Sequence, residues 1–162
     1  MITTSKAMTP VSKVITTTTV ELRIRTFMLL LSVLALVTTL TELWLQDHTR
    51  SWAQWIPWAL CTIGLVALVP ALLRPGRSTL LALRGAMLLV ALGGLVGIGF
   101  HFMENLGFQQ DIHPNAAFGT IIIDALKGAA PLLAPGTLVF AALLALVAAY
   151  AHPALQTHNA ST

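Results

Sequence analysis

Four long apolar runs, separated by short polar segments, dominate the pattern of this sequence. The runs cover about residues 26–45, 55–73, 78–103 and 132–150. A helix that crosses the hydrocarbon core of a bilayer needs about 20 mostly apolar residues. The pattern therefore predicts an all-α, polytopic membrane protein whose four transmembrane helices form an antiparallel bundle.

The composition supports this assignment to the membrane. Of the 162 residues, 56% are hydrophobic and 9% are charged, and the mean hydropathy is +0.82. A soluble domain carries about 25% charged residues, so this chain has too little polar surface to stay dissolved on its own. The net charge of +3 is small and the nine basic residues form no single patch, so we expect a lipid bilayer and no nucleic acid as a partner.

Polar tails flank the apolar region. Residues 1–25 are rich in Ser and Thr and carry basic residues, as the n-region of a signal peptide does. The apolar run after them is too long for a signal peptide and ends without a cleavage site, so we expect it to remain as the first span. We expect the tail 1–25 to be loosely ordered and residues 151–162 to form a second polar tail.

The connection between the third and fourth spans is the longest in the chain. Within it, residues 115–127 show a helical period, with Asn115 as the N-cap and Gly128 after the last turn. The apolar and polar residues of this segment fall on opposite sides of the helix. We therefore expect a short interfacial helix on the extracytoplasmic side, at the membrane surface or folded over the mouth of the bundle.

The distribution of Lys and Arg predicts the orientation. Seven of these residues lie in the N-terminal tail and around the turn between the second and third spans, whereas the other two connections hold only Arg50 and Lys127. By the positive-inside rule both termini are cytoplasmic, and we expect the inner membrane of a bacterium. Tryptophans favour the headgroup region, and all of them lie around the first connection, at Trp44, Trp52, Trp55 and Trp58.

The glycine-rich segment 93–104 in the third span holds the strongest candidate for a site. On a helix, small residues and then two ionisable residues share one face, namely Ala86, Gly93, Gly97, His101 and Glu104. Small residues let a neighbouring helix approach closely in lipid, and ionisable groups at membrane depth usually point into the protein. We expect this face to lie inside the bundle at its outer end.

His101 and Glu104, one helical turn apart, could bind a transition-metal ion together with ligands from other segments. The further candidate ligands near this end are Glu42, Asp47, His48 and His113. Imidazole combined with carboxylate suits zinc, copper, iron or manganese. The alternative is that His101 and Glu104 hydrogen-bond to each other or to a Thr or Asn on a facing helix.

Haem is a less favoured use of the same histidines. Two axial imidazoles from different spans would have to lie at one depth. His101 is the only histidine well inside a span, and His152 lies at the opposite membrane face, so a partner would have to come from His48 or His113.

These features indicate broad classes of function and no specific activity. The chain has no glycine-rich phosphate loop, no GxSxG nucleophile motif and no HExxH zinc-binding motif. We therefore expect a non-catalytic binding, accessory or assembly component that works with another membrane protein or as a homo-oligomer. A metal-binding membrane protein is the first alternative, and a small membrane enzyme or transporter with its site in the same outer mouth is the second.

Overall fold

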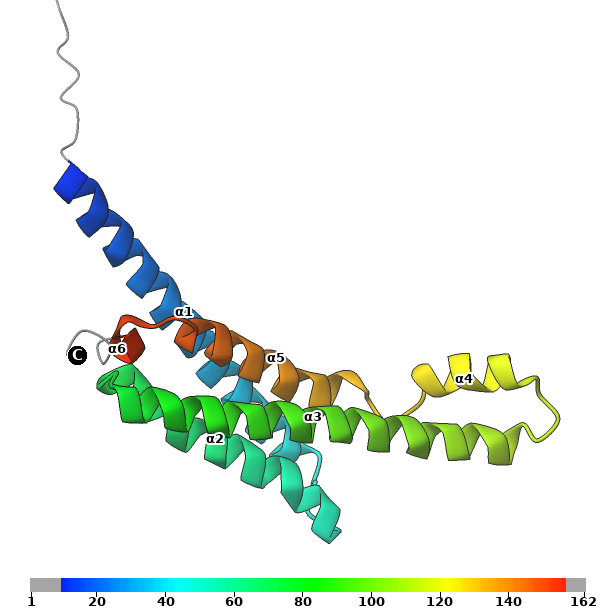
Figure 1. Cartoon of the computed structure of the whole chain (residues 1–162). Helices are drawn as coiled ribbons and strands as arrows, with labels where there is room; N and C mark the ends of the chain where they lie inside the picture. The colour runs from blue at the N-terminus through cyan, green and yellow to red at the C-terminus, as the bar shows by residue number, and fades with distance from the viewer. Residues whose placement is uncertain (1–9, 157–162) are drawn as a thin grey trace, which may run out of the picture.

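A computed structural model describes residues 10–156, and all regular secondary structure in this range is helical (Figure 1). In chain order the elements are α1 (Pro10–Leu45), the 3-10 helix η1 (Trp52–Gln54), α2 (Trp55–Leu73), α3 (Arg77–Ile112), α4 (Phe118–Leu126), α5 (Leu133–Ala149) and α6 (Pro153–Gln156). The prediction of an all-α protein is confirmed.

Three stretches are long and apolar enough to cross a membrane, namely Thr19–Leu45, Trp52–Leu73 and Arg77–Ile112. These stretches match the first three predicted spans and indicate an integral membrane protein in a lipid environment. The fourth predicted span corresponds to α5, an apolar helix of 17 residues.

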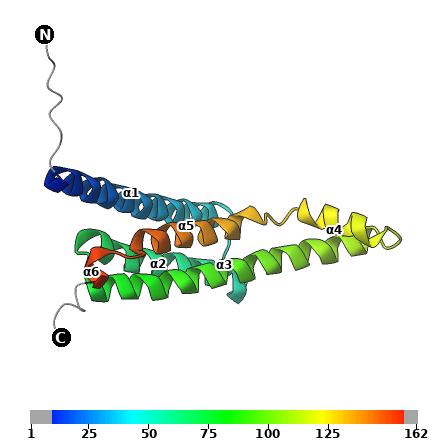
Figure 2. The same ribbon diagram turned by 45° about the horizontal axis from the view of Figure 1, so that its top comes forward.

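Helices α2 and α5 separate α1 from α3. Each of α2 and α5 packs against both α1 and α3, whereas the backbones of α1 and α3 do not come close to each other in the described part of the chain. Figure 2 shows α5 and α2 between α1 and α3. Small side chains of α5 allow this close packing, because Ala141, Ala142, Ala145, Ala148 and Ala149 are all buried.

The core also holds a polar contact of the kind that joins helices in lipid. The buried Ser32 hydroxyl on α1 donates a hydrogen bond of 2.8 Å to the backbone oxygen of Ala141 on α5. A hydroxyl at membrane depth has no water to bond, so a carbonyl on the facing helix satisfies it. This bond ties α1 to α5 at the centre of their contact.

Two helices extend beyond the predicted boundaries. Helix α1 begins at Pro10, so the prediction of a loosely ordered tail over residues 1–25 is wrong from Pro10 onward, while residues 1–9 lie outside the described residues. Helix α3 continues to Ile112, nine residues beyond the predicted end at Met103. At the C-terminus, the predicted tail contains the short helix α6, and residues 157–162 lie outside the described range.

The outer part of α3 and α4 form a hairpin that projects away from the other helices (Figures 1 and 2). We call residues 102–127 of this hairpin the arm. The short helix predicted over 115–127 begins at Phe118, and its N-cap is Ala117 instead of Asn115. Helix α4 packs against α3 and against no other described helix, so it does not fold over the ends of the other helices. The other expected position, at the membrane surface, stays a prediction.

Candidate functional site

Asn105 forms two hydrogen bonds at the base of the arm, and no role was predicted for this residue from the sequence. The Asn105 amide nitrogen donates to the Ala130 backbone oxygen, and the Ala130 backbone nitrogen donates to the Asn105 amide oxygen, both at 2.9 Å. Asn105 is only 4% exposed. The same amide fills the space beside Gly128, where no side chain would fit. Asn105 therefore fixes the connection between α4 and α5 to the wall of α3.

His101, one turn before Asn105, makes a second bond to the same connection. Its Nδ1 atom lies 3.0 Å from the backbone oxygen of Pro131. Because a carbonyl oxygen can only accept, Nδ1 carries the proton in this contact. Both residues thus bind backbone atoms just before α5 begins.

The helical face that meets α5 differs in phase from the predicted one. A Cβ atom on Gly94 would lie 2.9 Å from the Pro135 backbone oxygen, and a Cβ atom on Gly97 would lie 2.9 Å from the Pro135 Cβ atom. Gly93 instead faces Leu60 of α2, and Glu104 is exposed. The face of α3 that contacts α5 and its connection consists of Gly94, Gly97, His101 and Asn105.

The first connection also contributes to this end of the protein. The Trp58 indole nitrogen donates to the His48 backbone oxygen at 3.0 Å and holds the connection against the start of α2. Burial lowers the pKa of His48, the nearby His101 lowers it further, and Glu104 partly opposes both effects. These surroundings therefore favour the neutral form of His48.

The structure does not support the predicted metal site. In the part of the chain that the structure describes, no group of three His, Cys, Asp or Glu side chains could hold a metal ion. The Glu42 carboxylate accepts from Gln46, and the Asp47 carboxylate lies 3.9 Å from the Arg50 guanidinium.

His113 and Glu104 also stand apart from any common centre. His113 follows the last turn of α3 and lies 12 residues beyond His101, which is about 18 Å along a helix. Both His113 and Glu104 are exposed. Of the six predicted ligands, only His101 and Glu104 act on the charge of His48, and these three side chains form no metal-binding group among the described residues.

Two arginines hold the opposite end of α5. The Arg25 guanidinium of α1 donates to the backbone oxygens of Ala148 and Tyr150, both at 2.6 Å, and the Arg84 guanidinium of α3 donates to that of Ala149 at 2.8 Å. The last carbonyls of a helix lack partners within the helix and carry partial negative charge, so cations there are stabilising. The sequence had indicated these arginines only as topology signals.

In the described part of the chain, the contacts of these polar side chains join helices to one another. His101 and Asn105 fix the start of α5, and Arg25 and Arg84 fix its end. Comparison with protein families, with curated proteins and with solved structures finds no match for this chain.

Acidification should destabilise the folded protein through His48. Because the pKa of His48 is lowered in the folded state, the unfolded chain binds more protons once the pH falls below the ordinary value of 6.5. The free energy of unfolding should fall between about pH 7.5 and about pH 5.5, and His48→Gln should reduce this loss. Thermal unfolding in detergent at both pH values measures the effect. The control is His113→Gln at an exposed histidine, and an unchanged pH dependence in His48→Gln would contradict the prediction.

Proposed function

We propose that the protein is a four-span membrane protein in which α5 is the fourth span. In support, α5 packs against α1 and α3, and its two ends are bound by His101 and Arg84, which lie 17 residues apart on α3. At 1.5 Å per residue this separation is about 26 Å, close to the thickness of about 30 Å of a hydrocarbon core. The end that carries Arg25 and Arg84 is then cytoplasmic by the positive-inside rule.

This placement puts the arm outside the bilayer on the extracytoplasmic side. Helix α3 has 36 residues, about 54 Å, and is therefore much longer than the hydrocarbon core. The part of α3 beyond His101 is also where polar residues replace the apolar run, starting with Glu104 and Asn105. The arm accordingly stands in the aqueous or headgroup region.

The arm exposes large apolar side chains in that region, and this observation carries the proposed function. The exposed fractions are 62% for Met103, 58% for Phe108, 47% for Ile112, 66% for Phe118, 53% for Ile123 and 56% for Leu126. Burying apolar surface is worth about 25 cal/mol per Å², and contiguous exposed apolar surface outside lipid marks an interaction site. We propose that the protein is a non-catalytic accessory component that binds another protein through the arm.

The charge of the arm indicates what kind of protein surface it binds. Three carboxylates, on Glu104, Asp111 and Asp124, lie in the arm with a single basic residue, Lys127. Such an acidic surface is repelled by anionic lipid headgroups and attracts basic groups. The proposed partner is therefore an extracytoplasmic segment of a membrane protein that combines apolar and basic side chains.

Site-specific photo-crosslinking in cells tests this proposal. A photoreactive amino acid at Phe108 or Ile123 should yield one defined protein adduct, and Glu104→Gln with Asp111→Gln should weaken it. The matched control places the same group at Leu92 of α3, which is 61% exposed within the apolar run and should contact only lipid. The absence of a protein adduct at both arm positions would contradict the proposal, as would an equal adduct at Leu92. An adduct with a second copy of this chain would assign the arm to self-association instead.

A further inference from the structure

A groove lies between α2 and α3 on the outside of the helices, near the turn that joins them. Its volume is about 530 Å³, and its lining comes from residues 62–70 of α2 and 78–86 of α3. The groove is open to the surroundings, since the lining residues Val66 and Ala82 are both exposed. It is thus separate from the arm, which lies at the other end of α3 (Figure 1).

The groove exists because the side chains on one of its walls are small, and most of its lining is apolar. Ala82 and Ala86 of α3 leave space that larger residues would fill, and Val66, Ala67 and Pro70 of α2 form the facing wall. An apolar groove in a spanning segment faces hydrocarbon, where no water fills it. Its occupant must therefore be apolar over most of its length.

The length of the groove matches one leaflet of a bilayer. The α3 wall extends from Ser78 to Ala86, which corresponds to about 12 Å along the helix. Half of a hydrocarbon core is about 15 Å. A single acyl chain that begins at the membrane surface would therefore extend along the whole of this wall.

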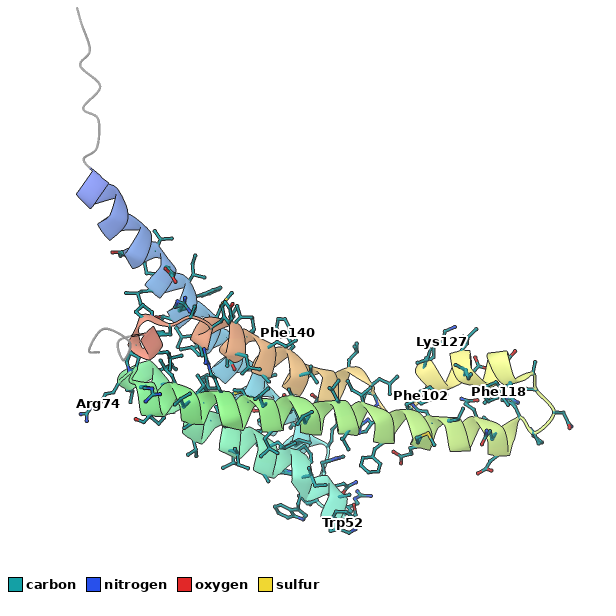
Figure 3. The ribbon with its side chains drawn as sticks, in the orientation of Figure 1. Trp52, Arg74, Phe102, Phe118, Lys127 and Phe140 are labelled. Atoms are coloured by element: carbon teal, nitrogen blue, oxygen red, sulfur yellow. The ribbon has the colours of Figure 1, made fainter. Side chains whose placement is uncertain are left out.

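Two free cations stand beside the surface end of the groove. Arg74 and Arg77 are exposed in the turn between α2 and α3, and their guanidinium groups form no hydrogen bond or ion pair with any described residue. Figure 3 shows Arg74 extending away from the helices at this end. Arg25 and Arg84, at the same end, are by contrast occupied by the carbonyls of α5.

No carboxylate in this part of the sequence neutralises the two arginines. The segment from Trp52 to Met103, which includes all of α2 and most of α3, contains no Asp or Glu. The charged residues of this segment, Arg74, Arg77 and Arg84, are therefore all basic, and basic residues between transmembrane helices bind anionic headgroups at the membrane surface. Glu21, a carboxylate of α1 at this end, is paired with Arg25.

We propose that this groove is a binding site for one anionic phospholipid of the cytoplasmic leaflet. One acyl chain lies along Ala82 and Ala86, and the headgroup phosphate pairs with Arg74 and Arg77. Guanidinium groups suit this role because they donate two parallel hydrogen bonds to phosphate oxygens. The site would bind a lipid that carries a net negative charge in preference to a zwitterionic lipid with the same acyl chains.

Native mass spectrometry of the full chain in a neutral detergent tests this site. Phosphatidylglycerol and phosphatidylcholine with identical acyl chains are titrated separately, and one phosphatidylglycerol per chain should be retained in preference. Arg74→Gln with Arg77→Gln should weaken phosphatidylglycerol binding about 30-fold, from about 1 kcal/mol for each arginine near a membrane surface. Ala82→Leu, which fills the groove, should abolish the adduct.

The controls match these substitutions outside the groove. Arg23→Gln removes an exposed arginine from α1, and Ala59→Leu adds the same bulk at an exposed position of α2. Both should leave phosphatidylglycerol binding unchanged. Equal binding of the two lipids, unchanged binding in either groove variant, or an equal loss in the controls would overturn the proposal. So would a dimer that Ala82→Leu disrupts, because the groove would then be a contact between copies of the chain.

Discussion

Replacing Asn105 with alanine should lower the free energy of unfolding by about 2 kcal/mol, because two hydrogen bonds are lost and two partly buried backbone groups are left without these partners. These groups are the backbone nitrogen and oxygen of Ala130, which bond to the side-chain oxygen and nitrogen of Asn105, respectively. No other described residue joins the connection between α4 and α5 to α3 by two bonds of this kind. Unfolding in mixed micelles with increasing sodium dodecyl sulfate measures the change. Glu104→Ala, at the exposed neighbouring position, should have little effect.

A substitution at Gly128 tests whether the packing of the Asn105 amide against this glycine contributes to the stability of the protein. Gly128→Ala should also destabilise the protein, because its Cβ atom would overlap the Asn105 amide. Once Asn105 is alanine the overlap disappears, so Gly128→Ala should cost little in that background. Such non-additivity is expected of residues in contact. Additive losses in the double variant would show that the contact does not carry the effect.

The membrane-crossing segments could be predicted from the sequence because hydropathy reports directly on burial in lipid. The end of α3 could not. The sequence becomes polar after Met103, and the predicted span stopped there. Hydropathy indicates where lipid ends, whereas a helix ends where its backbone hydrogen bonds end. In α3 these bonds continue to Ile112, because the arm is a polar continuation of the same helix.

The phase of the inner face could be predicted only approximately. Gly93 and Gly94 are adjacent, and either could mark the close approach of a neighbouring helix. The structure uses both, with Gly93 against α2 and Gly94 against α5, because α3 packs against both of these helices. A pattern that assumes one neighbouring helix cannot distinguish these positions.

The role of Asn105 was not predicted, for a chemical reason. His101 and Glu104, three residues apart, were predicted to act together because both side chains are ionisable. A buried carboxylate without a counter-charge is costly, whereas a neutral amide can bind a backbone nitrogen and oxygen at once. Asn105, four residues after His101, is on the same helical face and is the buried residue. The signal available in the sequence was that Asn105, an amide, follows His101 by four residues and therefore shares its helical face.

The roles of Arg25 and Arg84 could not be predicted for another reason. Both lie where the positive-inside rule expects basic residues, which is a sufficient explanation at the level of sequence. Their bonds to the last carbonyls of α5 join segments more than 60 positions apart in the chain. Contacts at such separations depend on how the helices pack, which hydropathy does not determine.

Replacing Gly94 with leucine should destabilise the protein most, by about 3 kcal/mol or more, because the added side chain has no route past α5. A Cβ atom there would lie 2.9 Å from the Pro135 backbone oxygen and 2.8 Å from a Val139 methyl group. A flexible side chain could move aside, but the backbone oxygen can move only if α5 shifts away from α3. That shift would also lengthen the bond between His101 and Pro131.

Gly99→Leu is the matched control, because no atom lies within 4 Å of a Cβ at this exposed position of the same helix. Since leucine also has the higher helix propensity by up to about 1 kcal/mol, Gly99→Leu should be neutral or stabilising. Equal stability of the two variants in the same micelles would mean that α3 and α5 do not pack as closely as described.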